Sequence, residues 1–217
     1  MISSKEPGVT RPAVIPLLVM AVAAVVMVVL ELHRGPVYSA LWLFGIFAEG
    51  AAYPALLAVC LPMMVVLGLG RRPVAIALGL ALMVLGLASG PVALANPVLR
   101  ARIRFFVERP AFSQVVELYR QGRLPTTGQD GYYGPKLPGP LCYLSANCRV
   151  ATLGYSGGQP ILYAPDWIGV PDDSIGFAHF AGEASGRYDG FGMQICPVVP
   201  LGEGWWWMDS CALKASS

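Results

Sequence analysis

Two long apolar runs, at residues 51–70 and 73–95, constrain the fold of this chain more than any other feature of its sequence. Neither run contains a charged residue, and only Arg71 and Arg72 separate them. A helix rises about 1.5 Å per residue and the hydrocarbon core of a membrane is roughly 30 Å thick, so each run is long enough to cross it. We therefore predict two transmembrane helices, over residues 51–70 and 73–95, joined as a hairpin.

A third apolar run, residues 13–30, follows a short polar segment, residues 1–12. A cleavable signal peptide is one interpretation, but the run is long for one and residues 37–40 make a poor cleavage site. We favour an uncleaved first transmembrane helix over residues 13–32, which gives a three-span anchor. The composition agrees, because only 13% of the residues are charged, whereas a soluble domain carries about a quarter.

Residues 33–50 are predicted to form an external loop. Within it, residues 37–48 are rich in aromatic side chains, which suits a segment lying at the membrane interface. The alternative is a short fourth span, which would move the C-terminal half to the other side of the membrane. Glu49 is a carboxylate between two apolar stretches, and an acid at membrane depth is a functional candidate, here for a small transporter or channel subunit. The simpler interpretation places Glu49 at the interface.

Small residues recur at helical spacing in the last apolar run. Gly79, Gly86 and Gly90 fall near one face of the predicted helix, and the last two form a GxxxG pattern. Small side chains let a neighbouring helix approach closely. We predict that this face packs on another helix, which belongs either to this chain or to another protein.

Residues 96–217 have the size of one small domain and are rich in turn-forming residues. Apolar residues at helical spacing predict an amphipathic helix that starts at Pro110 and stops near Gly122. The predicted fold class is a membrane α protein with three transmembrane helices, followed by a small α+β domain. In that domain one amphipathic helix packs on an antiparallel sheet, which a C-terminal β-hairpin closes. The strand-like runs are residues 141–144, 149–155, 160–164, 175–181, 191–199 and 205–208.

Four of the five cysteines lie in this domain as two symmetric pairs. Cys142 and Cys148 flank one turn-like segment, and Cys196 and Cys211 flank another. Cross-strand neighbours lie close enough to bridge after a small adjustment, so we predict disulfides within each pair and an oxidising compartment. Zinc binding by the four thiols is less favoured, because the CxxC pairs typical of zinc sites are missing.

The predicted disulfides also decide the orientation. Basic residues in short loops normally mark the cytoplasmic face, but here they nearly balance. Arg71 and Arg72 lie on the same side as the N-terminus, and the arginines of residues 100–109 lie on the other side. We predict that the N-terminus is inside and that residues 96–217 lie outside the cytoplasmic (inner) membrane.

His179, Asp172 and Asp173 are the candidate catalytic residues. Together they would suit an envelope hydrolase or a metal-dependent enzyme. The alternating apolar pattern that precedes His179 instead favours a half-buried histidine on a strand. Ser156 lies in a Gly-rich turn, but it lacks the helix that follows a nucleophile elbow. We predict no cofactor and no resident metal.

The least ordinary local feature is the run of three tryptophans at residues 205–207. In a strand, Trp205 and Trp207 face one side and Trp206 faces the other, so one face could bind a partner, a headgroup or a sugar. Burial in the core or docking on the membrane headgroups is the simpler interpretation. The same candidate binding surface includes Tyr132, Tyr133 and Trp167.

These residues identify no family. The leading hypothesis is a non-enzymatic, membrane-anchored accessory or interaction protein of the bacterial cell envelope. Its partners would be the lipid bilayer and, through the extracytoplasmic domain, another envelope membrane protein or a cell-wall glycan. The formal net charge of +2 is too small to favour a nucleic acid as partner.

Overall fold

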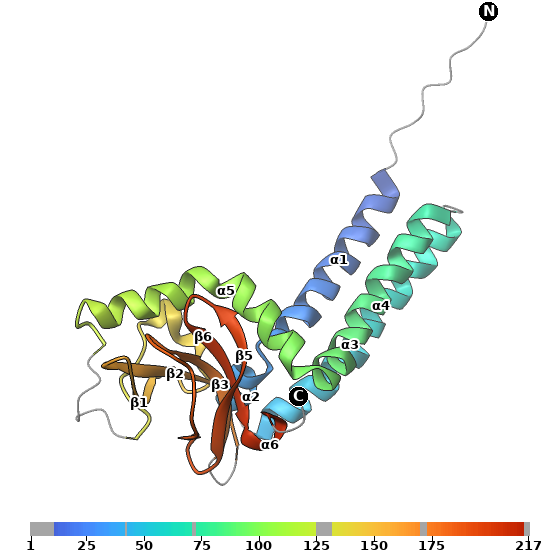
Figure 1. Ribbon diagram of the computed structural model, residues 1–217. Coiled ribbons are helices and arrows are strands. Elements are labelled where there is room, and N and C mark those ends of the chain that lie inside the picture. The colour runs from blue at the N-terminus through green and yellow to red at the C-terminus, as the bar shows by residue number, and fades with distance from the viewer. Residues whose placement is uncertain (1–10, 42, 71–72, 125–131, 170–172, 215–217) are drawn as a thin grey trace, which may run out of the picture. The chain divides into compact units, whose positions relative to one another are not determined.

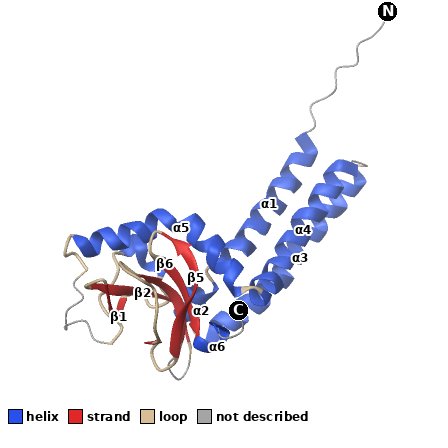
Figure 2. Ribbon diagram, viewed as in Figure 1, coloured by secondary structure: helices blue, strands red, loops and turns tan. Residues whose placement is uncertain are grey.

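The structure is a computed structural model, and its helices and strands are labelled in Figure 1. Figure 2 separates the helices from the strands, which all follow the long helices in the chain. The described residues are 11–41, 43–70, 73–124, 132–169 and 173–214.

The chain divides into two compact units. The first comprises the chain up to Glu31 together with Ala48–Ala95. The second comprises Leu32–Phe47 and Asn96–Ser217. Each unit is described by itself below.

Three long helices contribute to the first unit: α1 (Arg11–Leu32), α3 (Leu43–Leu69) and α4 (Pro73–Ala95). Each contains a stretch long and apolar enough to cross a membrane, which confirms the three apolar helices predicted from the sequence. Many apolar side chains also lie on the outside of the helices, which suits contact with lipid rather than water. The buried side chains between the helices include Met20, Met27, Leu56, Cys60 and Leu67.

The glycines of α4 pack against the other helices of this unit. A Cβ atom at Gly79 would lie 2.8 Å from the sulfur of Met64, and one at Gly86 would lie 2.8 Å from a methyl group of Leu56. Both distances are too short for a real contact, so a larger residue would force these side chains to shift. In this structure the small-residue face packs against helices of the same chain.

Gly90 leaves room for a buried hydrogen bond. The Tyr53 hydroxyl donates to Oε1 of Glu31 at 2.7 Å, and Glu31 is only 4% exposed. A Cβ atom at Gly90 would collide with that hydroxyl and lie 2.9 Å from the Glu31 carboxylate. Among the described acids of the helical unit, Glu31 is therefore the buried one, which sequence reasoning missed, whereas Glu49 lies half-buried near the start of α3.

Replacing Gly90 with alanine tests this packing. We expect the free energy of unfolding to fall by about 1–3 kcal/mol, because the Tyr53 ring must move to admit the methyl group. Gly68→Ala is the matched control, since nothing lies within 4 Å of its added Cβ atom and alanine is the better helix former. Thermal unfolding of both variants in detergent measures the difference. Equal midpoints would contradict the tight fit at Gly90.

The second unit is built on six strands. They are β1 (Ala151–Ser156), β2 (Gln159–Ile168), β3 (Ser174–His179), β4 (Tyr188–Asp189), β5 (Gln194–Gly202) and β6 (Trp205–Ser210).

These strands form one antiparallel sheet in the order β1-β2-β3-β6-β5-β4. The edge strands β1 and β4 contact each other, so the sheet nearly closes into a barrel. The predicted C-terminal hairpin is β5–β6, whose two-residue turn is Glu203–Gly204. Both turn residues have positive φ angles, 52° and 79°, which is the conformation that a tight hairpin of this kind requires.

Helix α5 (Pro97–Arg120) covers one face of this sheet, and each face has its own core. Trp205 and Trp207 are buried on the α5 side, where the Trp205 ring lies 4.8 Å from the Phe112 ring between centroids. Trp206 points to the other face and packs, half-buried, against the second core. The predicted alternation of the tryptophans holds. Both rings are buried, which agrees with the interpretation that one face of this strand packs in the core.

Two predictions of secondary structure in this unit are wrong. Helix α5 begins at Pro97, not at Pro110, which lies exposed in the helix interior. An exposed proline there loses one backbone hydrogen bond, but the packing of the buried face offsets this loss. Residues 141–144 belong to a 3-10 helix, η1 (Gly139–Leu144), rather than to a strand. The prolines at 138 and 140 favour this short turn.

The segment predicted as an external loop, residues 33–50, has helical structure. These residues contain helix α2 (Arg34–Leu41) and the first turns of α3. Helix α2 packs on β2, and Gly35 allows that approach because a Cβ atom there would overlap the backbone carbonyl of Asp166. The described residues contain three candidate spans, and residues 37–48 do not form a fourth one among them.

The four cysteines of this unit form the two predicted pairs, Cys142–Cys148 and Cys196–Cys211, with Cα atoms 4.2 and 4.9 Å apart. The prediction placed Cys196 and Cys211 directly opposite each other on the hairpin, and the observed register differs. Two bulges shift the β5–β6 register, so Cys196 lies opposite Asp209, and Cys211 follows at the start of α6 (Cys211–Lys214). The pairing therefore closes the end of the hairpin rather than bridging directly opposed residues.

Candidate functional site

Charged side chains from α5 and β2 form a buried cluster in the second unit. Asp166 of β2 accepts hydrogen bonds from both Arg100 and Arg104. Arg104 also donates to the carbonyl oxygen of Tyr143 at 2.8 Å and to Glu108 at 3.1 Å. The side chains of Arg104 and Asp166 are each only 1% exposed. The guanidinium therefore exchanges its water shell for a set of protein acceptors.

The cluster extends to the start of this unit through a histidine. His33 lies just before α2, and its Nε2 is 2.5 Å from Oε1 of Glu108. Burial lowers the pKa of Arg104 from its ordinary value, and the negative charge of Glu108 opposes that shift. Two arginines and two carboxylates balance each other, and this balance makes a buried charge cluster tolerable.

Sequence reasoning missed this cluster, although a signal was present. Arg100, Arg104 and Glu108 are four residues apart, which places them on one stripe of α5. Asp166 interrupts an otherwise apolar strand, and a buried acid of that kind needs a cationic partner. In the sequence these arginines look like loop charges that report membrane orientation, whereas Arg100 and Arg104 are paired inside the domain.

The variant Asp166→Asn tests how much the domain depends on the cluster. Its amide cannot neutralise two buried guanidinium groups, so we expect the free energy of unfolding to fall by about 3–5 kcal/mol. Glu203→Gln is the matched control, because it breaks an exposed ion pair with Arg109 and should change stability far less. Urea unfolding followed by tryptophan fluorescence measures both. Equal losses in the two variants would contradict the assigned role of Asp166.

A second candidate site is a cavity of about 310 Å³ beside His179. The imidazole lies half-buried at the end of β3, and its ring centroid is 5.3 Å from that of Trp205. Burial lowers the pKa of His179, and the nearby positive charge of Arg120 lowers it further. The cavity thus places an imidazole beside a guanidinium. It is lined by Val116, Tyr119, Arg120, Gln159, Pro160, Leu162, His179 and Ala181.

The structure does not assemble the predicted catalytic group. Asp173 directly precedes β3, and His179 is its last residue, so their Cα atoms are about 20 Å apart along an extended strand. The side chain of Asp173 points instead toward the backbone near Gly169. Asp172 lies outside the described residues. The described structure therefore does not bring His179 and Asp173 together, because they lie at opposite ends of β3.

The lowered pKa of His179 predicts how stability depends on pH. As the pH falls below the ordinary histidine value of 6.5, the unfolded chain binds a proton that the folded imidazole resists. The contribution of His179 to the free energy of unfolding should therefore be fully present above this pH and should decrease below it. We expect His179→Gln to weaken this dependence. Urea midpoints of wild type and variant at about pH 7.5 and about pH 5.5 measure it; an unchanged dependence in the variant would contradict the assignment.

A third candidate is an aromatic cluster formed by Tyr132, Tyr133 and Phe191. The Tyr132 ring lies 5.4 Å from the Tyr133 ring and 5.1 Å from the Phe191 ring, between centroids. The Tyr132 hydroxyl donates to Asp189 at 3.0 Å. Tyr132 is nevertheless 59% exposed, so its ring is held in place while one face stays open to solvent.

The remaining predicted aromatic residues lie elsewhere. Trp167 is partly exposed near the end of β2 and packs beside Gly169. Its ring makes no contact with the rings of Tyr132 or Tyr133 within the described part of the chain. Trp206 faces the second core. Of the predicted binding residues, only Tyr132 and Tyr133 therefore come together.

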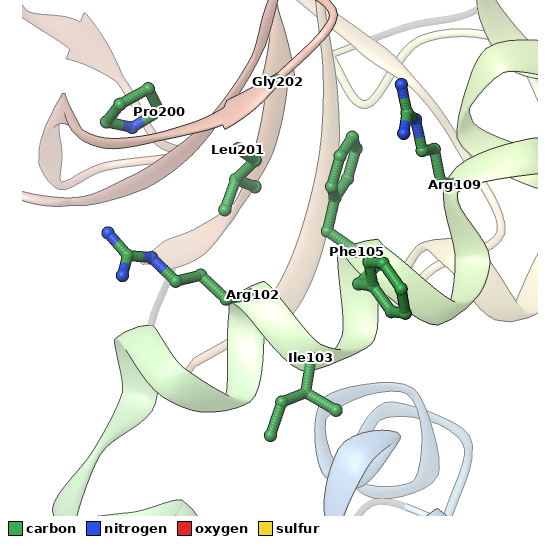
Figure 3. Close-up of a pocket in the computed structure, with 8 residues that line it drawn as sticks. Arg102, Ile103, Phe105, Arg109, Pro200, Leu201 and Gly202 are labelled. Carbon is green, nitrogen blue, oxygen red and sulfur yellow. The ribbon is translucent and has the colours of Figure 1, made fainter.

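A fourth feature is a cavity of about 440 Å³ between the N-terminal half of α5 and the end of β5. Figure 3 shows Arg102 and Arg109 on either side of Phe105 and Leu201, with Ile103 directed away from the hairpin. Arg109 pairs with Glu203, which raises the pKa of Arg109 and lowers that of Glu203. The sequence alone indicates only that these arginines are charges near the membrane.

Comparison with protein families, with curated proteins and with solved structures finds no match for this chain.

Proposed function

We propose that this chain is a membrane-anchored interaction protein of the bacterial cell envelope. The three apolar helices support the anchoring, and the two cysteine pairs support an oxidising compartment for the folded domain. An oxidising compartment for the domain implies that the N-terminus is inside and that the domain lies outside the cytoplasmic membrane.

The observation that carries the binding role is the Tyr132 cluster. A tyrosine ring that is ordered by Tyr133, Phe191 and Asp189 but open on one face loses little side-chain freedom when a ligand covers it. Such rings are frequent anchors in binding surfaces, since they offer a large apolar face and a polar hydroxyl. The ligand class is a wall glycan or an extended segment of another envelope protein. Asp189 adds a carboxylate that can accept hydrogen bonds from either.

The variant Tyr132→Ala tests this proposal. If the ring is a central anchor, its loss should cost about 2 kcal/mol of binding free energy, which is roughly a thirtyfold weaker affinity. The measurement is co-sedimentation of the full chain in mild detergent with purified cell-wall glycan, and co-purification of envelope proteins from the same cells.

Tyr155→Ala is the matched control for this experiment. Tyr155 is 69% exposed on β1, and it belongs to neither the Tyr132 cluster nor a cavity described above. Retained binding in Tyr155→Ala and lost binding in Tyr132→Ala would support the proposal. Equal binding of wild type and Tyr132→Ala to every ligand would contradict it.

A further inference from the structure

The N-terminal half of α5 carries an exposed apolar stripe. Leu99, Ile103, Phe106 and Val107 are all exposed, and Phe106 is the most exposed of them at 78%. Their spacing places them on one side of the helix, opposite the buried side that carries Phe105. Farther along the helix the exposed residues are polar instead: Ser113, Gln114, Glu117 and Arg120.

The chain itself places this stripe near a membrane surface. Helix α4 is a candidate span that ends at Ala95, and α5 begins at Pro97 after a single residue. From Ala95 to Phe106 a helical chain advances by only about 16 Å. The apolar stripe therefore lies within the reach of the headgroup region, where exposed phenylalanine and aliphatic side chains are more stable than in water.

Positive charge borders one side of the stripe. Arg102 and Arg109 are separated by two turns of α5 and border the cavity of about 440 Å³ against Pro200 and Leu201. Arg102 is exposed and makes no ion pair within the part of the chain that the structure describes. Arg109 holds the exposed carboxylate of Glu203, for which an anion could substitute.

We propose that this face of α5 docks on the surface of the membrane that holds the anchor, and that Arg102 and Arg109 bind the phosphate of an anionic phospholipid. The apolar stripe enters the interface while the arginines bind the headgroup. Amphipathic helices at a membrane surface usually separate their apolar and basic side chains in this way. Docking would fix the orientation of the domain relative to the membrane plane. This inference rests on the membrane anchoring and is independent of the Tyr132 cluster.

Depth measurements test the apolar part of the proposal. A nitroxide label at Phe106→Cys, in a Cys60→Ala background and in phospholipid nanodiscs, should be more accessible to oxygen than to a water-soluble nickel chelate. A label at Gln114→Cys, about two turns farther along the same helix, should show the reverse. If both labels were equally accessible to the nickel chelate, the stripe would lie in water and the proposal would be overturned.

Lipid binding tests the charged part. Native mass spectrometry of the detergent-purified full chain, titrated with phosphatidylglycerol or with phosphatidylcholine, counts the lipids bound. We expect Arg102→Gln to weaken phosphatidylglycerol binding about fivefold and to leave phosphatidylcholine binding unchanged. Arg123→Gln, which removes the same charge from an exposed residue just beyond the C-terminal end of α5, should bind both lipids like wild type.

Two outcomes would overturn the phosphate site. Equal weakening in Arg102→Gln and Arg123→Gln would mean that phosphatidylglycerol responds only to the overall charge. Unchanged binding in Arg102→Gln would mean that the headgroup binds elsewhere. Because Arg102 is exposed and pairs with no described residue, neither result would reflect loss of the fold.

Discussion

The contact on which the second unit most depends is the buried pairing of Arg104 with Asp166. It joins α5 to β2, and the same guanidinium holds the carbonyl of Tyr143 in the 3-10 helix η1. Through Glu108 the cluster reaches His33 and so the segment that leads into α2. A buried ion cluster adds little stability compared with an apolar core, but it strongly disfavours any arrangement that leaves one charge alone. It therefore fixes which face of α5 turns inward.

That choice of face has consequences on both sides of α5. Inward, Phe112 meets Trp205 and completes the core against the sheet. Outward, the same rotation leaves Phe106 and its apolar neighbours exposed beside Arg102. The domain thus presents two different surfaces: an apolar, basic face close in sequence to the last span, and the ordered aromatic cluster around Tyr132. We propose that the first surface docks on the membrane and that the second binds a partner.

Much of this arrangement could be predicted from the sequence because the signals were local. Uninterrupted apolar runs predicted the three helices, and turn residues with alternating patterns predicted the C-terminal hairpin and the alternation of Trp205, Trp206 and Trp207. What the sequence did not reveal depends on contacts between distant segments. The partner of Arg104 lies 62 residues away in Asp166, and two bulges set the position of Cys196 in the hairpin. His179 and Asp173 are close in sequence, yet an extended strand separates them in space.

The central claim is that a disulfide-paired domain is anchored by three spans with its cysteines outside the cytoplasm. Labelling of intact cells with a membrane-impermeant thiol reagent, before and after treatment with an impermeant reductant, tests this claim most directly. The account predicts no labelling of Cys142, Cys148, Cys196 and Cys211 before reduction and full labelling after it, without lysis. Free thiols that react only after the cells are permeabilised would contradict both the orientation and the oxidising compartment.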